Sequence, residues 1–277
     1  MSTKLFKIKE LKTQKIIHGI FHCKYKENKK TKYGDPYISV GLIDSSGSIE
    51  GKIWEYSDHY DKVFEEGDIV AIKGSSNIYR KKLELNVLHI AKYDSSIYDN
   101  YGFKSDFILS KIDFDSSFLF KEVCNYFSCT GNNSKIIKAL YKDYKKSIVS
   151  VPYSLEFENQ LEGSYLNNLY RSLKIFDLLN STSFRLDVFN SGLIYSLLFL
   201  KNFHMVVGCQ KNIIYTLNDA AKEKGALNVF HDCFKKYEAL ASKKDFSLLE
   251  RCIFDPSEET LEEDIVSKIF RLVEHAD

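Results

Sequence analysis

The stretch Pro36-Tyr-Ile-Ser-Val-Gly-Leu-Ile-Asp-Ser-Ser-Gly-Ser-Ile-Glu-Gly-Lys-Ile-Trp54 decides the fold of the N-terminal part of this chain. Apolar residues alternate with polar or small ones on both sides of Asp44-Ser-Ser-Gly47, and this spacing predicts two strands, each with one buried face. Asp favours a turn because its carboxylate accepts hydrogen bonds from the backbone that follows, and Gly tolerates positive φ. The stretch therefore predicts a β-hairpin. The residues expected on its core face are Ile38, Val40, Leu42, Ile49, Gly51 and Ile53.

Three more strands are expected around this hairpin. The first is Gln14–Lys26, and Ile69–Gly74 and Leu83–Ala91 follow the hairpin. Residues 27–35 form a Lys-rich loop in this prediction, and Ser57–Phe64 is a short helix with Ser57 as its N-cap. Five short strands with a helix after the third predict a small Greek-key barrel of OB type. On the first strand, Ile17, Gly19, Phe21 and Cys23 are expected to face the core, and the side chains expected to face outward are His18, Ile20, His22, Lys24 and Lys26. On the last strand, Leu83, Leu85, Val87 and His89 alternate with Glu84, Asn86, Leu88 and Ile90.

The second half of the chain has helical rather than alternating spacing of apolar residues. The fold class expected is α+β, with residues 1–93 as an OB-fold barrel, 94–117 as a connector and 118–277 as an all-α domain. The helices are expected over Phe118–Phe127, Ser134–Lys145, Leu166–Leu179, Phe189–Phe203, Ile213–Lys222, Val229–Leu240 and Glu262–Val273.

Composition places few limits on function. The net charge of the 277 residues is only +1, but residues 4–32 carry +8 and residues 254–277 carry −6, so the chain is polarised. The six cysteines include no CxxC pair, which favours reduced thiols in a cytoplasmic protein and makes structural zinc unexpected. The longest apolar run, Leu193–Leu200, is far shorter than the roughly 20 residues that span a membrane. The N-terminus lacks the apolar core of a secretion signal.

An OB barrel with these surface residues predicts binding of single-stranded nucleic acid. Such barrels combine a basic groove with aromatic side chains on which bases stack. Tyr37 and Trp54 lie on the outer face of the hairpin, and residues 79–82 form the loop between the last two strands. The candidate binding residues are Lys24, Lys26, Tyr37, Lys52, Trp54, Tyr79, Arg80, Lys81 and Lys82. The alternative is that Trp54 covers one end of the barrel and that the lysines only solvate the surface.

The sequence also resembles a known family. The runs Tyr37–Asp44, Gly47–Trp54 and Phe64–Val70 are similar to the N-terminal OB domain of the YhaM family of 3′-to-5′ exoribonucleases. The resemblance covers residues 10–92, and over residues 150–277 it rests on the pattern and order of the helices. It implies a helical HD phosphohydrolase domain after the barrel, in which histidine and aspartate hold a metal ion that activates water.

The chain departs from the HD pattern at the metal ligands. In Glu162–Leu169, which resembles the first motif, asparagine stands where histidine is expected. In Leu193–Lys201, Phe199 and Leu200 replace the His-Asp pair, and neither side chain can bind a metal. The resemblance therefore implies an HD-like domain without its metal ligands and without a cofactor. An alternative set, His204, His231 and Asp232, would hold manganese or another divalent metal.

The function expected from the sequence is that of a binding protein for single-stranded RNA or DNA with a catalytically inactive HD-like domain. No membrane partner is expected, and the helical domain offers a surface for homo-oligomer formation. Two alternatives stay open. One is a divergent metal-dependent 3′-to-5′ exoribonuclease, and the other is a module that binds only proteins.

Overall fold

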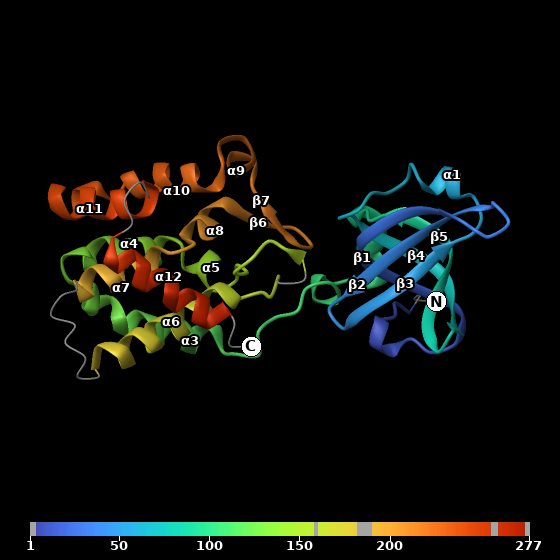
Figure 1. The fold of residues 1–277 in the computed structure, drawn as a ribbon, viewed down its shortest axis with the longest axis horizontal. Coiled ribbons are helices and arrows are strands. Elements are labelled where there is room, and N and C mark those ends of the chain that lie inside the picture. Colours follow the sequence, from blue (N-terminus) through green and yellow to red (C-terminus); the bar gives the residue numbers. More distant parts are fainter. Residues whose placement is uncertain (1–3, 158–159, 182–189, 256–259, 275–277) are drawn as a thin grey trace. The chain divides into compact units, whose positions relative to one another are not determined.

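The computed structural model describes residues 4–157, 160–181, 190–255 and 260–274, and the chain divides into two compact units (Figure 1). The first unit, here called the barrel unit, comprises residues 1–110, and the second, the helical unit, comprises residues 111–277. The boundary lies inside the segment 94–117 that the sequence predicts as a connector.

The barrel unit is a closed five-stranded barrel with the strand order β1-β2-β3-β5-β4. The pairing of β3 with β5 is parallel, and the other neighbours pair in antiparallel fashion. A short helix, α1, lies between β3 and β4, so the topology is that of an OB fold, as predicted. The elements are β1 (Gln14–Lys30), β2 (Pro36–Asp44), β3 (Gly47–Ile53), α1 (Ser57–Tyr60), β4 (Ile69–Tyr79), β5 (Lys82–Lys92) and α2 (Ser95–Tyr98).

The hairpin β2–β3 is confirmed, and so is the physical reason for its turn. Asp44 pairs with Gly47 across a two-residue loop, and the Asp44 carboxylate accepts hydrogen bonds from the Ser46 backbone N–H (2.7 Å) and hydroxyl (2.6 Å). Gly47 has a φ of 155°, a conformation that a side chain would oppose. The expected inward residues, Ile38, Val40, Leu42, Ile49, Gly51 and Ile53, are all buried.

Strand β1 differs from the prediction in length and in the burial of its outer face. It continues to Lys30, so the first part of the expected loop 27–35 is strand. Ile20 and His22, which were expected to face outward, are only 2% and 7% exposed. Leu5 before β1 and Ile97, Tyr98 and Tyr101 after β5 line a pocket with Ile20 on this face. The Phe6 N–H also donates to the His18 carbonyl at 2.9 Å. The burial of both faces explains why simple alternation was wrong here.

Strand β5 and helix α1 also differ from the prediction in detail. Lys73 and Gly74, neighbours on β4, pair with His89 and Val87, so Leu88 of β5 is the extra residue of a bulge, and His89 is exposed whereas Ile90 is buried. The strict alternation predicted for this strand therefore ends at Leu88. Helix α1 ends at Tyr60 rather than Phe64, and Tyr56, in a left-handed conformation, precedes it, so Ser57 is not the N-cap.

Residues 94–110 pack against the barrel. Phe103, Ile108 and Leu109 are buried, and the Ser45 N–H at the β2–β3 turn donates to the Phe107 carbonyl at 2.8 Å. The Phe103 ring packs against Tyr93 (5.0 Å between ring centroids) and Phe107 (6.0 Å), so this segment forms its own contacts beside the barrel rather than joining the hydrophobic cluster inside it.

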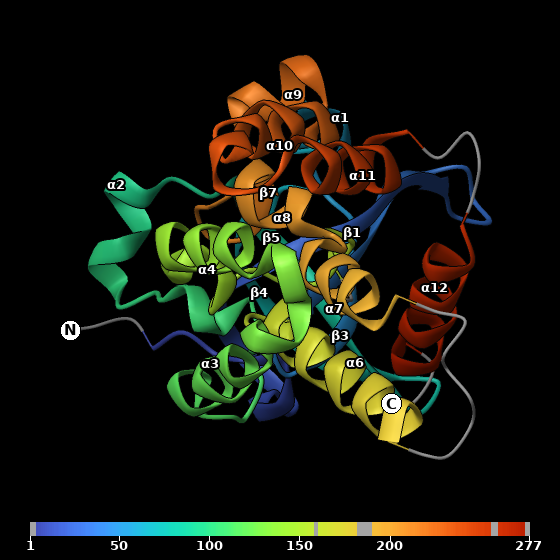
Figure 2. The ribbon, with the colours of Figure 1, turned by 90° about the vertical axis from the view of Figure 1, so that its left-hand side faces the viewer.

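The helical unit is built around α7, whose residues from Leu193 to Leu200 are all buried. Figure 2 shows α4 and α12 on opposite sides of this unit. Its elements are α3 (Ser116–Cys124), α4 (Ser134–Asp143), α5 (Lys145–Ile148), α6 (Ser164–Ser181), α7 (Ser191–Leu200), α8 (Phe203–Gly208), β6 (Cys209–Lys211), β7 (Tyr215–Leu217), α9 (Asp219–Lys224), α10 (Ala226–Lys235), α11 (Lys243–Phe254) and α12 (Leu261–Glu274). None of the helices in the described residues is long and apolar enough to cross a membrane.

Most of the predicted helices are present, but the unit is not all-α. The hairpin β6–β7 begins before the helix expected over 213–222, and α9 starts only at Asp219. Of the helix expected over 189–203, residue 189 lies outside the described residues, and α7 confirms only Ser191–Leu200, because Asn202 adopts a left-handed conformation (φ 56°) and separates α7 from α8. Helix α11 was not predicted.

Candidate nucleic-acid interface

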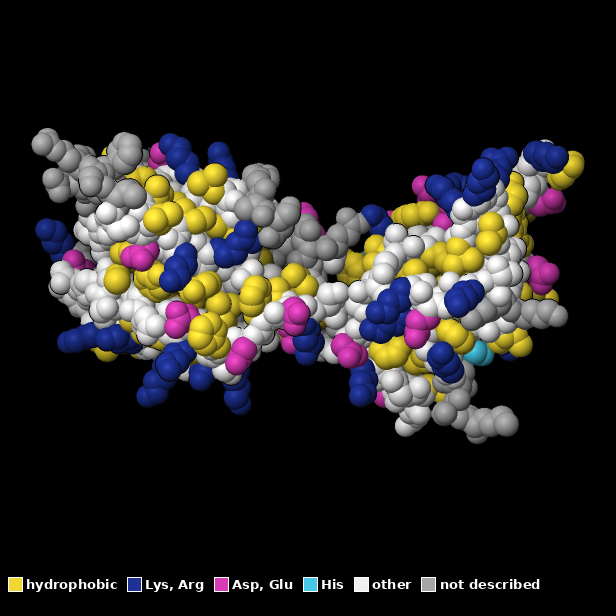
Figure 3. Space-filling view, turned by 90° about the horizontal axis from the view of Figure 1, so that it is seen from below, with side chains coloured by type: hydrophobic (Ala, Val, Ile, Leu, Met, Phe, Trp, Pro, Cys, Tyr) yellow, Lys and Arg dark blue, Asp and Glu magenta, His cyan; other side chains and the backbone are white. Residues whose placement is uncertain are grey.

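A groove of about 530 Å³ runs over the outer face of β2, β3 and β5, between the end of β1 and the β4–β5 turn. On the surface in Figure 3, Lys and Arg side chains of the barrel unit lie among hydrophobic ones. We call this groove the aromatic groove. Its lining residues are Lys30, Thr31, Lys32, Tyr37, Lys52, Trp54, Asn77, Tyr79, Glu84, Leu85 and Asn86.

Three aromatic side chains of the groove present ring surface to solvent. Ile38 on β2 pairs with Ile53 on β3, so the next residues outward, Tyr37 and Trp54, lie opposite each other. Their ring centroids are 4.7 Å apart. Trp54 is 47% exposed and Tyr79 is 51% exposed. About half of the surface of each of these two side chains is therefore open to solvent.

Lys52 connects the aromatic rings. Its ammonium lies 5.1 Å from the Tyr79 ring centroid and 6.0 Å from that of Trp54, and it forms an ion pair with the Glu84 carboxylate at 2.7 Å. Burial alone would lower the pKa of Lys52, but the hydrogen bond and charge of Glu84 outweigh burial and raise it. Lys52 is therefore a fixed positive charge between two aromatic surfaces.

The turn between β4 and β5 adds cations at one end of the groove. Tyr79 pairs with Lys82, so Arg80 and Lys81 are the two central residues of the turn, with φ values of 47° and 67°. This is the conformation of tight hairpin turns that usually contain Asn or Gly. The Arg80 guanidinium lies 5.4 Å from the Tyr79 ring centroid. Arg80, Lys81 and Lys82 are all exposed.

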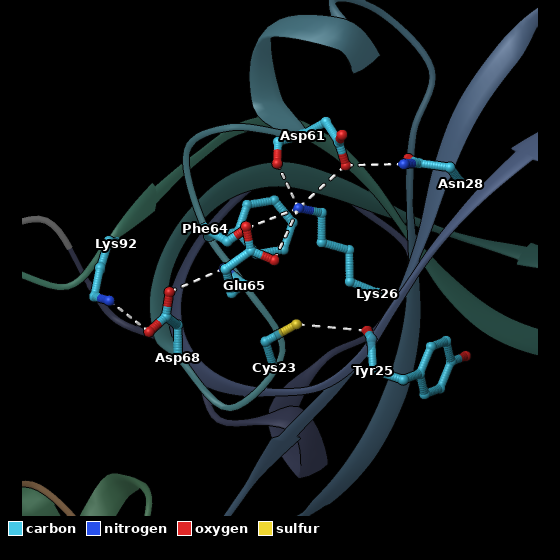
Figure 4. Close-up of polar contacts among 9 residues, drawn as sticks. All are labelled: Cys23, Tyr25, Lys26, Asn28, Asp61, Phe64, Glu65, Asp68 and Lys92. Atoms are coloured by element: carbon cyan, nitrogen blue, oxygen red, sulfur yellow. Dashed lines mark hydrogen bonds and ion pairs between the residues drawn. The ribbon is translucent and has the colours of Figure 1, made fainter.

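Lys26, another candidate, lies away from this groove and is held inside the protein (Figure 4). Its side chain is only 8% exposed, and its ammonium donates to the carbonyls of Asp61 (2.5 Å) and Phe64 (2.8 Å). It also pairs with the Asp61 carboxylate at 3.1 Å, and hydrogen bonds from Asn28 and Lys26 lower the pKa of Asp61. Lys26 fixes the segment after α1, so we do not include it in the interface.

Lys24 lines a second groove, of about 520 Å³, on the same side of the barrel. Glu84 lines both grooves, so they are neighbours. In the second groove, Tyr25 lies over Gly41, where an added Cβ would approach the Tyr25 ring to 2.2 Å. Sequence reasoning missed Tyr25 as a possible platform. A glycine within a strand marks such close approach and could have indicated it.

The alternative metal-binding residues make other contacts. The His231 imidazole Nε2 lies 2.7 Å from the Glu250 carboxylate, and Asp232 pairs with Lys224 at 3.3 Å. His204 lines a different pocket, and burial, followed by the nearby Lys201 charge, lowers its pKa. Among the described residues, no group of three or more His, Cys, Asp and Glu side chains could hold a metal ion.

Comparison with known proteins gives partial likenesses. No family model matches the chain. A stretch of 57 residues, 21% of this chain, is 33% identical to the 3′-5′ exoribonuclease YhaM of Geobacillus sp. (strain WCH70), and the match spans only 18% of that protein. Among solved structures, the second OB-fold domain of replication protein A from Methanococcus maripaludis is similar. The match covers 33% of this chain and 96% of that domain, with 25% sequence identity and a TM-score of 0.28. The match to the single-stranded DNA binding protein from Thermus aquaticus covers 29% of this chain and 40% of that protein's chain, with 14% sequence identity and a TM-score of 0.26.

Proposed function

We propose that the barrel unit binds single-stranded nucleic acid, RNA or DNA, in the aromatic groove. The observation that supports this most directly is that exposed rings and fixed cations line the same groove. Tyr37, Trp54 and Tyr79 provide the rings, and Lys52 lies between two of them. Aromatic rings stack on bases of any sequence, and cations attract the phosphates between those bases.

The ion pair of Lys52 with Glu84 decides how the groove would work. Because Glu84 neutralises Lys52, the main phosphate contacts fall to the exposed cations Lys30, Lys32, Arg80 and Lys81 at the ends of the groove. Lys52 instead holds the rings apart and supports them through cation–π contacts. Stacking in the centre and phosphate contacts at the ends together describe the expected binding mode.

Replacement of Trp54 by alanine tests the proposal. If a base stacks on this ring, Trp54→Ala weakens the binding of a labelled single strand by about 1 to 3 kcal/mol. Tyr101→Ala is a matched control, because Tyr101 is also 47% exposed but lies outside the aromatic groove. Binding is measured by fluorescence anisotropy at several salt concentrations. Equal affinity of Trp54→Ala and wild type, or no binding by wild type at low salt, would reject the proposal.

For the helical unit we propose an HD-like domain that has lost its metal ligands. Phe199 and Leu200, which stand where the His-Asp pair is expected, are 0% and 1% exposed. The Phe199 ring meets the Tyr141 ring edge-on at 5.1 Å between centroids, and the Tyr141 hydroxyl donates to the Phe199 carbonyl at 2.8 Å. These contacts support a role for the position in packing. In this proposal the chain is a binding protein rather than an enzyme.

The second candidate function is a divergent metal-dependent 3′-to-5′ exoribonuclease, which the 33% identity to YhaM over 57 residues favours. An RNA decay assay with added manganese separates the two. The binding proposal expects no shortening of 3′ ends by wild type. Shortening that disappears in both His204→Ala and His231→Ala would instead support the enzyme.

A further inference from the structure

One side of the helical unit carries lysines without acidic partners. Six exposed lysines lie on α3, α4 and α5: Lys121, Lys135, Lys138, Lys142, Lys145 and Lys146. Elsewhere in this unit, some lysines form ion pairs, such as Lys211 with Glu162 and Lys268 with Asp264, whereas others, such as Lys243 and Lys244, form none among the described residues. Among the described ion pairs, none involves any of the six. Figure 3 shows several Lys and Arg side chains projecting from one edge of this unit.

Helix α4 arranges three of these lysines in a row. Lys135, Lys138 and Lys142 are spaced by three and four residues, so they share one face of the helix. The opposite face is the buried one, with Ile136, Ile137, Leu140 and Tyr141 all 0% exposed. At 1.5 Å per residue the row extends for about 10 Å, so its lysines can contact neighbouring phosphates of one nucleic-acid strand. We call this row, together with Lys121, Lys145 and Lys146, the lysine face.

The charge on this side contrasts with that of the rest of the unit. Residues 111–277 contain 21 Lys and Arg and 23 Asp and Glu, a net charge of −2. Residues 116–148 contain six Lys against Glu122 and Asp143, a net charge of +4. The remainder of the unit is therefore at −6. A positive field confined to one side of an acidic unit selects a polyanion that lies along that side.

Two aromatic residues near these lysines favour nucleic acid over an acidic polypeptide. Phe118 is 60% exposed, one helical turn from Lys121 on α3. The Lys145 ammonium lies 5.0 Å from the Phe120 ring centroid, which connects α5 to α3. A line of cations beside an exposed ring offers both a contact for phosphates and a surface for a base.

We propose that the lysine face is a second nucleic-acid-binding surface, separate from the aromatic groove, that contacts the phosphates of strands too long for the groove alone. That the ligand is a nucleic acid rests on the proposed function of the barrel, whereas the existence of the positive surface follows from the positions of the lysines alone. Its contacts are mainly electrostatic, so its contribution falls steeply with salt.

The test compares short and long single strands on the full chain. Oligonucleotides of about 6 and about 30 nucleotides are titrated by fluorescence anisotropy from about 50 to about 200 mM salt. The triple variant K135Q/K138Q/K142Q is expected to bind the long strand at least tenfold more weakly at low salt, with a slope of log K against log salt that is shallower by about 2. The short strand is expected to bind as in wild type. The control K222Q/K243Q/K244Q removes the same charge from exposed lysines of α9 and α11.

The outcomes separate this inference from the function of the barrel. If Trp54→Ala weakens both strands but the triple variant binds the long strand like wild type, the lysine face is wrong and the barrel proposal stands. If only the long strand binds and only the triple variant affects it, the lysine face stands and the barrel proposal fails. Equal losses in the triple variant and the control would overturn the inference. The inference would also be overturned if poly-glutamate displaced the labelled long strand as strongly as unlabelled nucleic acid does.

Discussion

His22 is a titratable residue within the wall of the barrel. It lies on β1 between partners on β2 (Ile43) and β4 (Ile69), and it is 7% exposed. Burial lowers its pKa to about 4, and the nearby Asp68 charge opposes this only in part. The neutral form of the imidazole is therefore the one compatible with the folded barrel.

This burial predicts a pH dependence of stability. Because the folded-state pKa of His22 lies below the unfolded value of about 6.5, its contribution is fully present above pH 6.5 and is lost as the pH falls toward 4. Between pH 7 and pH 5 the free energy of unfolding should decrease by about 2 kcal/mol through this residue. Urea unfolding of wild type and His22→Leu at both pH values measures the difference. A loss of the same size in both proteins would show that His22 is not its origin.

Single residues also show where sequence reasoning reached its limit. The outward placement of Tyr37, Lys52 and Trp54 followed from alternation along a regular hairpin, and these residues do line one groove. Lys26 was misjudged because its side chain reaches carbonyls after α1 that lie more than 30 residues away in sequence. Such a contact depends on the tertiary structure, which the spacing of apolar residues along one strand does not predict.

At the scale of elements, the β4–β5 turn combines strain with charge. Arg80 and Lys81 both have left-handed backbone conformations, which cost a non-glycine residue of the order of 1 kcal/mol each. Neither side chain is buried. The strained turn places the Arg80 cation over the Tyr79 ring and leaves the Lys81 cation exposed next to it in sequence.

Exchange of this turn for Asn-Gly should separate stability from binding. The variant R80N/K81G is expected to raise the free energy of unfolding by about 1 kcal/mol, because both residues then suit the turn. It should bind single strands more weakly and with a shallower salt dependence, since two cations are lost. Chemical denaturation and anisotropy titrations measure both effects. K81G alone, which keeps Arg80, should give an intermediate binding loss, and unchanged binding in R80N/K81G would exclude the turn from the interface.

A bulge explains the error on one strand. Burial alternates along β3, but residues 38–42 of β2 are all buried, and alternation fails on β5 at Leu88, the extra residue of the bulge. A bulge depends on the partner strand, so the β5 sequence alone does not reveal it. The hairpin β6–β7 was missed because its strands are only three residues long.

At the scale of the whole molecule, two compact units have separate hydrophobic interiors. The barrel interior includes Phe21, Ile38 and Val70, whereas the helical unit is organised around α7. Phe103, Ile108 and Leu109 lie beyond the predicted end of the barrel domain at residue 93 but are buried in the barrel unit. The autonomous folding unit should therefore extend to residue 110.

Truncation tests this boundary. A fragment of residues 1–110 is expected to unfold cooperatively and to bind a short single strand about as well as the full chain does. A fragment of residues 1–93 should be less stable by several kcal/mol, because loss of the segment exposes buried apolar surface. Thermal unfolding followed by circular dichroism compares the two. Equal melting temperatures would show that residues 94–110 add nothing to the barrel.

The position of Trp54 has a practical consequence. It is the only tryptophan in the chain, and it lies half-exposed on the groove that we propose for nucleic acid. Indole emission excited at the red edge, where tyrosine absorbs little, therefore reports on this one location without any attached dye. Quenching of that emission by an unlabelled oligonucleotide would locate its bases beside Trp54 on the barrel unit.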